Sequence, residues 1–373
     1  MLFSALSGIR VLDLAHYIPG PYATLMLADF GADVLKVEPP GGDPMRRMKP
    51  LDKDGISLTY KAFNRNKRSV TLDLKTDTSK RTFEKMLEGA DILLESFRPN
   101  VMIRLGFSRT RIAKINPRLI HCALTGYGQA GPLQEASGHD INYMALMGGL
   151  HASGLKVRPI PAFPPVADHA SAMHATITLL AALLAREKTG RGAFLDVSIA
   201  ESVLPWQRMV LAASGAAGED VRRLGHLLNG GAACYQVYET KDKGFITLGA
   251  LEEKFWRNFC EAVDRPDWAA RQFEPMPQED LIEELRERFA STTLAKWIAL
   301  LSKVDCCFQE VTPTSELSAH PQIHARSFLK EAQQDGRAFT EILFPARVDD
   351  ALPDVRREWK EVGAEEALHE WEM

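Results

Sequence analysis

Several signatures of particular protein classes are missing from this sequence. The chain of 373 residues has five cysteines, an odd number with no CxxC pair, which argues against a disulfide framework and a zinc cluster. Its longest apolar tract, Ile177–Ala185, is far too short to span a bilayer. The first residues lack the basic region and cleavage site of a signal peptide. We therefore expect a soluble protein of a reducing compartment, the cytoplasm, with no membrane partner.

The sequence also lacks a strong net charge and the common motifs of nucleotide and hydrolase sites. A formal net charge of −4 gives no electrostatic footprint for nucleic acid. The turn "AHYIPGPYA" is not a dinucleotide fingerprint, because GxGxxG is missing, and no Walker, HExxH or GxSxG motif occurs. We therefore expect no nucleic-acid partner, and any ligand site has to be found by other signals.

The first 200 residues do contain an alternation of strand and helix patterns. Short β-rich runs predict strands over Ile9–Leu14, Ala32–Glu38, Ser69–Leu74, Asp91–Phe97 and Arg118–Gly128. Helical patterns between and after them cover Pro19–Gly31, Ser79–Ala90 and Ala170–Arg186. Such an alternation predicts an α/β fold in which helices cover both faces of a mostly parallel sheet.

The pattern changes near residue 215, and a chain of this length is expected to form two domains. The stretch Ser214–Ala233 is rich in Gly and Ala and predicts a linker, and Tyr235–Leu251 predicts a hairpin. Helical patterns follow over Glu253–Val263 and Glu279–Leu301, whereas the tail after about Phe328 is acidic and irregular. We predict a large domain over 1–213, completed by about 328–373, and a small α+β domain with its linker over 214–327.

Two basic clusters follow early predicted strands. The first holds Arg46, Arg47 and Lys49, and the second holds Arg65, Lys67 and Arg68, with Lys75 soon after. Loops after strands carry ligands in α/β sheets, and several Arg and Lys side chains suit the oxygens of a polyphosphate. A solvated basic surface explains the same pattern. The sequence leaves both interpretations open.

A histidine and an aspartate, His139 and Asp140, stand together at the start of a predicted helix in "SGHDINYMALMGGL". A lone histidine at such a place is most often a capping residue or a buried residue with its hydrogen bonds satisfied, and catalysis is the alternative. The helix dipole alone explains an aspartate in the first turn. The pair therefore marks a candidate site without identifying its chemistry.

A series of co-linear segments resembles the CoA-transferase family III superfamily over nearly the whole chain. They include "LSGIRVLDLA", "ADFGADVLKVEPPGGDP", "NRNKRSVTLDLK", "GHDINYMAL" and "EKTGRGAFLDVSIAES". The resemblance implies a Rossmann-like large domain, a smaller domain, and an interlocked homodimer in which two chains thread through each other. It also implies that acyl-CoA is the substrate, with no further cofactor and no metal.

Two chemistries compete within that superfamily. Transferases use one aspartate, here Asp168, as a nucleophile that forms a mixed anhydride. The α-methylacyl-CoA racemases resemble this chain in having a histidine at His139 and a glutamate at Glu252, which would orient that histidine. These matches favour a racemase of 2-methylacyl-CoA thioesters in lipid metabolism, working through an enolate with His139 and Asp168 as two bases. A CoA-transferase and an inactive CoA-binding protein are the alternatives.

The resemblance further implies which residues contact CoA, with Arg98 and Arg104 meeting its phosphates. The positions that match the CoA-binding segments of the family are Leu72, Asp73, Leu74, Lys75, Ser96, Phe97, Arg98, Arg104, Gly138, Asp140, Ile141, Asn142 and Tyr143. One departure is His169, which places an imidazole beside Asp168 where relatives often have a small or apolar residue.

Overall fold

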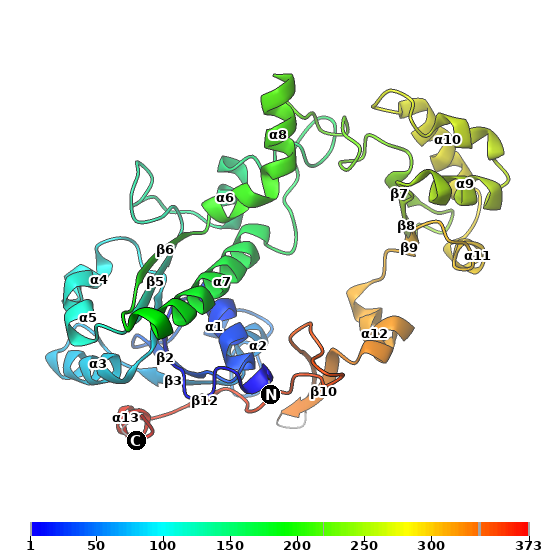
Figure 1. Ribbon diagram of the computed structural model, residues 1–373. Coiled ribbons are helices and arrows are strands. Elements are labelled where there is room, and N and C mark those ends of the chain that lie inside the picture. Colours follow the sequence, from blue (N-terminus) through cyan, green and yellow to red (C-terminus); the bar gives the residue numbers. More distant parts are fainter. Residues whose placement is uncertain (1, 219, 335–336, 372–373) are drawn as a thin grey trace. The chain divides into compact units, whose positions relative to one another are not determined.

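The computed structural model describes residues 2–218, 220–334 and 337–371 and divides into two compact units (Figure 1). We call them the large unit, Met1–Met147, Phe163–Trp206 and Pro321–Met373, and the small unit, Gly148–Ala162 and Gln207–His320. The division falls a few residues before each predicted domain boundary, and it assigns Gly148–Ala162 to the small unit. Among the helices of the described residues, none combines the length and apolar composition needed to cross a membrane.

The large unit contains a parallel sheet whose strands follow the order β12-β3-β2-β1-β4-β5-β6 within the described residues. Its strands are β1 (Arg10–Leu14), β2 (Asp33–Glu38), β3 (Lys67–Thr71), β4 (Ile92–Glu95), β5 (Ile120–Thr125), β6 (Phe194–Ser198) and β12 (Lys360–Glu361). The predicted α/β fold with a parallel sheet is confirmed. Without β12, the order is that of a Rossmann fold.

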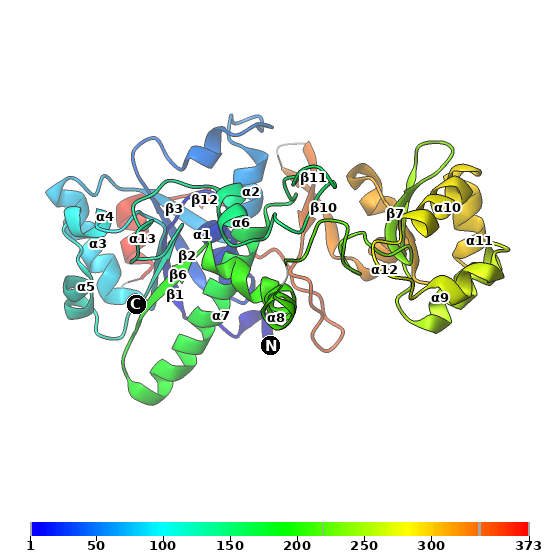
Figure 2. The same ribbon diagram turned by 90° about the horizontal axis from the view of Figure 1, so that it is seen from above.

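Helices cover both faces of this sheet (Figure 2). Those of the large unit are α1 (Pro19–Asp29), α2 (Leu58–Asn64), α3 (Asp77–Gly89), α4 (Val101–Arg104), α5 (Arg109–Ile115), α6 (Asp140–Leu146), α7 (Val166–Thr189), α12 (Pro321–Arg326) and α13 (Ala364–His369). Proline in the first turn of α1 and a left-handed Gly190 after α7 are typical helix boundaries. Since α1 and α7 pack together on one face and α3, α5 and α13 on the other, the strands between them are buried on both sides.

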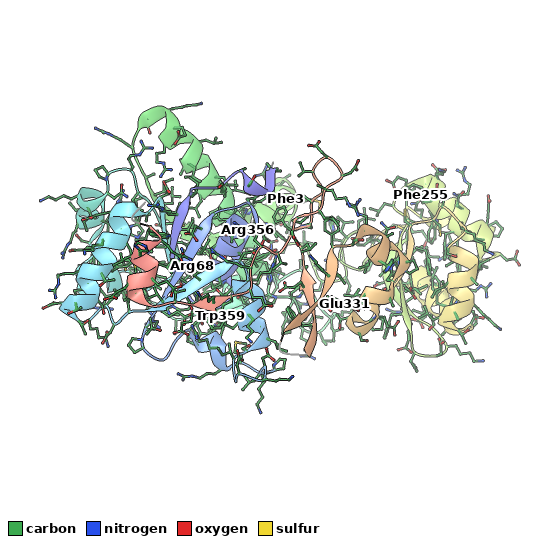
Figure 3. All side chains as sticks on the ribbon, turned by 90° about the horizontal axis from the view of Figure 1, so that it is seen from below. Phe3, Arg68, Phe255, Glu331, Arg356 and Trp359 are labelled. Atoms are coloured by element: carbon green, nitrogen blue, oxygen red, sulfur yellow. The ribbon has the colours of Figure 1, made fainter. Side chains whose placement is uncertain are left out.

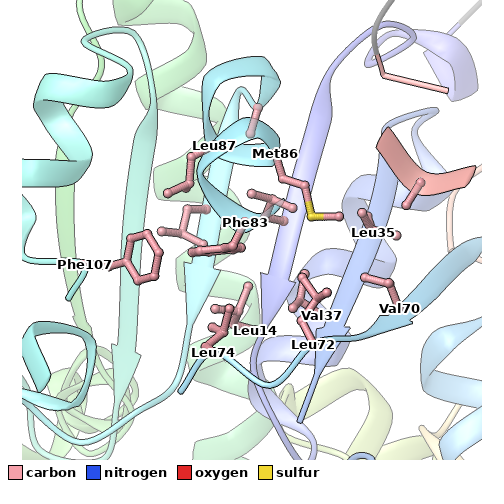
Figure 4. Close-up of a cluster of buried hydrophobic side chains, with 14 of the residues drawn as sticks. Leu14, Leu35, Val37, Val70, Leu72, Leu74, Phe83, Met86, Leu87 and Phe107 are labelled. Atoms are coloured by element: carbon pink, nitrogen blue, oxygen red, sulfur yellow. The ribbon is translucent and has the colours of Figure 1, made fainter. Parts of the chain in front are cut away.

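The core on the α3 face explains why α3 is amphipathic (Figure 4). Its residues Phe83, Met86 and Leu87 are fully buried against apolar side chains of β1, β2 and β4. Phe83 also meets the ring of Phe107 edge-on, with the centroids 4.9 Å apart. Burying each such side chain stabilises the fold by about 1.5–3 kcal/mol, so this apolar stripe fixes α3 on the sheet.

The small unit is built around an antiparallel sheet and a core rich in aromatic residues. Its elements are α8 (Arg208–Ala217), β7 (Tyr235–Glu239), β8 (Phe245–Gly249), α9 (Glu253–Ala262), α10 (Glu279–Ala290), α11 (Leu294–Leu301) and β9 (Phe308–Glu310). Trp256, Trp268 and Trp297 are buried there with their indole N–H groups hydrogen-bonded. The predicted β7–β8 hairpin is confirmed.

Three sequence predictions about secondary structure were wrong. The predicted helix Glu279–Leu301 is broken after Ala290, because "STT" favours a turn and a new helix start. The predicted linker begins inside α8, which ends at the left-handed Gly218. The tail is not irregular, since it contains the hairpin of β10 (Leu329–Gln334) and β11 (Arg337–Ile342), and it adds β12 beside β3.

The second basic cluster is neither a solvated surface nor free for phosphate. The Lys67 ammonium is fully buried and lies 3.2 Å from the Asp13 carboxylate, with further hydrogen bonds to Thr24 and Asn64. Arg65 and Arg68 pair with Asp29 and Asp33, each at 2.7 Å. The carboxylate partners stand 35 or more residues earlier in the chain, so sequence proximity could not reveal them.

The first basic cluster is divided between structure and surface. Arg46 lies 2.6 Å from Glu38 and packs over the rings of Tyr60 and Trp359, whereas Lys49 is exposed. Figure 3 shows Trp359 near Arg68, where the tail returns to the edge of the sheet. The Trp359 indole N–H donates to Ser69 in β3 at 3.0 Å. Arg46 therefore attaches the tail to the sheet.

Removing Asp13 should strongly destabilise the protein, because Lys67 and Lys36 would lose the carboxylate that lies between them. We expect Asp13→Ala to lower the free energy of unfolding by about 3–5 kcal/mol. Urea denaturation followed by circular dichroism measures this change. The control is Arg286→Ala, which removes a solvent-exposed pair with Glu283 and should change stability by no more than about 1 kcal/mol. An equally small effect for Asp13→Ala would contradict the structural role of the buried pair.

Candidate active site

The strand order of the large unit reverses between β1 and β4, and this is where open α/β sheets bind ligands. The chain leaves β1 and β4 in loops that lead into helices on opposite faces of the sheet, so a crevice opens between them. A cavity of about 310 Å³ lies there. It is lined from the β1 end by His16, Tyr17 and Pro19, from the β4 end by Ser96, Phe97, Arg98 and Pro99, from the β5 end by Leu124, Thr125 and Gly126, and further by Gln134, Ala136, Ser137, Gly138, His139, Tyr143, Asp168 and Ile199.

Asp168 is the acidic side chain in the lining of this cavity. It lies in the first turn of α7 and is half-buried. Burial raises the pKa of its carboxyl to about 6, and the nearby charge of Asp140 adds to the shift, while His169 and His139 oppose it. A carboxyl group with this pKa is largely ionised at neutral pH, and it is a stronger base than an ordinary aspartate.

Asp140 positions Asp168 as well as raising its pKa. Its Oδ1 accepts a hydrogen bond from the backbone N–H of Asp168 at 3.1 Å. The first N–H groups of a helix have no partner within the helix, so this contact caps α7 from another segment. Asp140 is absent from the cavity lining. The structure therefore gives Asp140 a capping and electrostatic position rather than a place at the reacting atoms.

His139 and Asp168 line the same cavity, as two catalytic groups acting on one substrate would require. The backbone N–H of His139 donates to the Asn142 side chain at 3.0 Å, which caps α6. The imidazole is exposed within the large unit, and the ring of Tyr17 meets it edge-on with the centroids 6.0 Å apart. The capping function and the cavity position thus coexist in one residue.

Two glycines shape the wall beside Asp168. The Tyr143 hydroxyl donates to the carbonyl of Gly138 at 2.7 Å, and burial raises the pKa of Tyr143 to about 12. A Cβ at Gly126 would lie 2.6 Å from the Tyr143 oxygen, and one at Gly138 only 2.7 Å from the Tyr127 oxygen. A side chain at either position would therefore have to displace a phenol ring.

Two cavity residues after β1 were not identified from the sequence. Burial, followed by the charge of Lys36, lowers the pKa of His16, so its ring is neutral at physiological pH. Tyr17 has φ 60°, a left-handed conformation that costs a residue with a bulky side chain roughly 1–2 kcal/mol. In the sequence, the one feature that marks these two residues as candidates for a ligand site is their position directly after the first strand. A tyrosine gives no sequence signal for a positive φ.

The predicted CoA contacts fall into three groups. Ser96, Phe97, Arg98, Gly138 and Tyr143 line the cavity of Asp168. Leu72, Asp73, Leu74 and Lys75 line a second cavity of about 210 Å³, and Phe97 belongs to both linings. Arg104, Asp140, Ile141 and Asn142 belong to neither lining. The structure thus brings most of the predicted contacts to two cavities that share a wall.

Two further predicted residues lie elsewhere. His169 belongs to a different cavity lining, where its ring meets Tyr22 edge-on at 5.3 Å and its Nδ1 lies 2.5 Å from the Pro165 carbonyl. Glu252 belongs to the small unit, where it precedes the first residue of α9. Its predicted pairing with His139 stays a prediction.

Comparison with known proteins gives a consistent result. A model described as CoA-transferase family III matches residues 6–365. The chain is 32% identical over 336 residues to acetyl-CoA:oxalate CoA-transferase of Acetobacter aceti, covering 86% of this chain and 84% of the relative. It is 33% identical to the succinyl-CoA–L-malate CoA-transferase beta subunit of Chloroflexus aurantiacus, covering 84% of this chain and 78% of that subunit.

A solved structure extends the likeness to the fold. A CaiB/BaiF family protein from Brucella suis superimposes with a TM-score of 0.84, at 25% identity, over 95% of both chains. The curated relatives described above are named as transferases rather than racemases. The comparisons therefore agree with the resemblance at the level of the superfamily, and they favour the transferase alternative over the racemase prediction.

The pKa of Asp168 predicts the pH dependence of any reaction that needs its carboxylate. Because the folded pKa is raised, the reactive ionised form is lost as the pH falls through about 6, so kcat/KM should fall there. Asp140→Asn keeps an oxygen for the Asp168 N–H but removes the charge that raises the pKa, so the fall should move to lower pH. Glu88→Gln, an exposed change in α3, is the control. A pH–rate profile of the three proteins checks this, and an unmoved profile in Asp140→Asn would refute it.

Proposed function

The chain belongs to CoA-transferase family III, and from this premise we propose that it transfers CoA from an acyl-CoA donor to a free carboxylic acid. Asp168 is the covalent nucleophile of this proposal. The observation that carries it is the placement of one half-buried carboxyl, with its pKa raised to about 6, in a cavity at the reversal of the strand order. Transferase names among the relatives support the same assignment.

The proposed reaction needs one carboxylate and no redox chemistry. The Asp168 carboxylate attacks the thioester carbonyl, the C–S bond breaks, and CoA leaves as a thiolate from a mixed anhydride. The thiolate then attacks the aspartyl carbonyl, which releases the first acid and leaves CoA on Asp168. The second acid attacks this thioester, and the same two steps in reverse order give the new acyl-CoA and free Asp168.

The two cavities that share Phe97 suit an extended substrate such as acyl-CoA. In this proposal the thioester lies beside Asp168, and the remainder of CoA continues past Phe97 toward Leu72–Lys75. Leu72 and Leu74 give the second cavity apolar walls that suit a flat base, and the Lys75 ammonium suits a phosphate. The names of the relatives point to a dicarboxylic acid as acceptor.

A racemase is the second candidate, because His139 and Asp168 line one cavity as two opposed bases would. In that reaction each base serves one face of the α-carbon, and the thioester is never cleaved. The interlocked homodimer, the pairing of Glu252 with His139 and the cytoplasmic location are further proposals that rest on the family resemblance.

Two substitutions separate these reactions. Asp168→Asn removes the nucleophile while keeping its shape, so exchange of CoA between succinyl-CoA and labelled succinate should be abolished. His139→Ala should retain exchange within about tenfold, because an exposed imidazole is not required to form the anhydride. Mass spectrometry of the wild type incubated with succinyl-CoA and hydroxylamine should find the hydroxamate of Asp168, because hydroxylamine attacks the aspartyl thioester and releases CoA.

An experiment in heavy water can contradict the transferase proposal. Wild-type protein incubated with a 2-methylacyl-CoA in D₂O should give no α-deuterium if it acts as a transferase. The racemase would be established, and the transferase refuted, by two results together. The wild type would take up deuterium without any acyl exchange, and His139→Ala would abolish that uptake. Binding with neither reaction would leave only the CoA-binding alternative.

Arg98 is the predicted phosphate contact that lines the cavity, whereas Arg104 does not. We expect Arg98→Ala to raise KM for acyl-CoA by about tenfold and to change kcat less. An interaction made equally in the ground and transition states stabilises both, so its loss weakens binding without raising the barrier from the bound complex. Arg104→Ala, which removes an exposed guanidinium outside the lining, should raise KM less. Steady-state kinetics measure both effects, and a fall in kcat at unchanged KM for Arg98→Ala would count against a binding role.

A further inference from the structure

Tyr17 is held at the cavity in a conformation that its own side chain disfavours. It has φ 60°, in the region that favours glycine. Its side chain is 46% exposed, so burial in the core does not explain the conformation. The ring instead lines the cavity of Asp168 and meets the ring of His139 edge-on, at 86° between the planes. Strained residues of this kind concentrate at functional sites, so the conformation calls for a functional explanation.

Two other left-handed residues of the large unit, Asn66 and Asn100, have local explanations. Asn66 has φ 65°, and its side chain bonds to Asp29 and accepts from the backbone of Arg356. Asn100 has φ 68°, and its amide donates to Glu135 at 3.2 Å. Asparagine tolerates this conformation well, and these hydrogen bonds hold it. Tyr17 has a bulky ring in the same conformation, and that ring is directed to the cavity and not to a structural partner of this kind.

The β1–α1 turn prevents Tyr17 from relaxing. The buried Lys36 ammonium donates to the carbonyl of Ala15 at 2.5 Å, and the backbone N–H of His16 donates to Ser96 at 3.0 Å. On the other side, α1 begins at Pro19, and a Cβ on Gly20 would lie only 2.0 Å from that of Ala15. With both ends fixed, the turn presents the Tyr17 ring beside His139 in the lining of the cavity.

We propose that the Tyr17 ring excludes water from the acyl intermediates on Asp168, and this inference rests on the proposed transferase reaction. Both intermediates are open to hydrolysis, because water can attack a carbonyl carbon and break either the C–O bond of the anhydride or the C–S bond of the aspartyl thioester. That reaction regenerates the Asp168 carboxylate and releases the acid, with CoA leaving as the thiol, so the net change is acyl-CoA plus water to acid plus CoA. A transferase must suppress this loss. The ring of Tyr17 lines the cavity beside His139, where its apolar face takes up space that water would otherwise fill.

The test compares hydrolysis with transfer. Wild type, Tyr17→Gly and Tyr17→Phe are incubated with succinyl-CoA and labelled succinate, and both free CoA and labelled succinyl-CoA are measured. Tyr17→Gly should raise the ratio of hydrolysis to transfer by about tenfold. It should not lower the melting temperature, because glycine relieves the left-handed conformation. Tyr17→Phe keeps the ring and should keep the wild-type ratio.

A matched control removes a left-handed residue that does not line the cavity. Lys243 has φ 64° in the β7–β8 turn and is exposed, so Lys243→Gly should leave the ratio unchanged. An unchanged ratio in Tyr17→Gly would overturn the proposal, and so would a Tyr17→Phe variant that hydrolyses as much as Tyr17→Gly. Failure of the proposed function is recognised separately, since the wild type would then show neither exchange nor the Asp168 hydroxamate.

Discussion

The large unit depends on charges that it buries beneath the loops of the candidate site. Lys67 and Lys36 are both almost completely inaccessible, and they share the carboxylates of Asp13 and Asp43. Burial alone would lower the pKa of both ammonium groups. For Lys36 the charges of Asp13 and Asp43 outweigh burial and raise the pKa, whereas for Lys67 burial prevails and its pKa falls to about 8. Buried charges of this kind tolerate only one arrangement, because removal of one partner leaves another uncompensated. The network therefore links β1, β2 and β3 and fixes their register.

This constraint reaches the candidate site through the backbone. Lys36 bonds to Ala15, the residue before His16, and Lys67 bonds to Pro21 and Thr24 in α1. The β1–α1 turn is thus held from beneath at both ends, and the same turn presents His16 and Tyr17 to the cavity. On the other wall, Asp140 caps α7 and so sets the position of Asp168. Rigid elements therefore hold both walls of the cavity around the Asp168 carboxyl. Because water cannot rearrange freely there to solvate the charged form, the raised pKa of Asp168 is maintained.

The sequence predicted the parallel sheet well, because strands buried on both faces are short continuous runs of apolar and β-branched residues. It failed where the outcome depends on partners far along the chain. Arg65, Lys67 and Arg68 resemble a phosphate site or a charged surface until Asp13, Asp29 and Asp33 are found against them. The prediction of an irregular tail was wrong for a similar reason, because β12 forms only by pairing with β3. Most predicted CoA contacts line a cavity, since the resemblance supplied them, whereas the strained Tyr17 has no counterpart in composition or periodicity.

The choice between transferase and racemase cannot be made from the identities of His139, Asp168 and Glu252. A carboxylate with a raised pKa serves equally well as a nucleophile and as a base, so Asp168 is compatible with both reactions. The two reactions differ in which substrate atom lies beside the carboxylate: the carbonyl carbon in one case, and the hydrogen of the adjacent carbon in the other. These atoms are only two bonds apart, and the walls of the cavity decide which of them lies beside the carboxylate. Under the proposed function, the determinants are therefore the cavity residues that would place the thioester, such as Tyr17, Phe97 and Tyr143, rather than a histidine that also caps a helix.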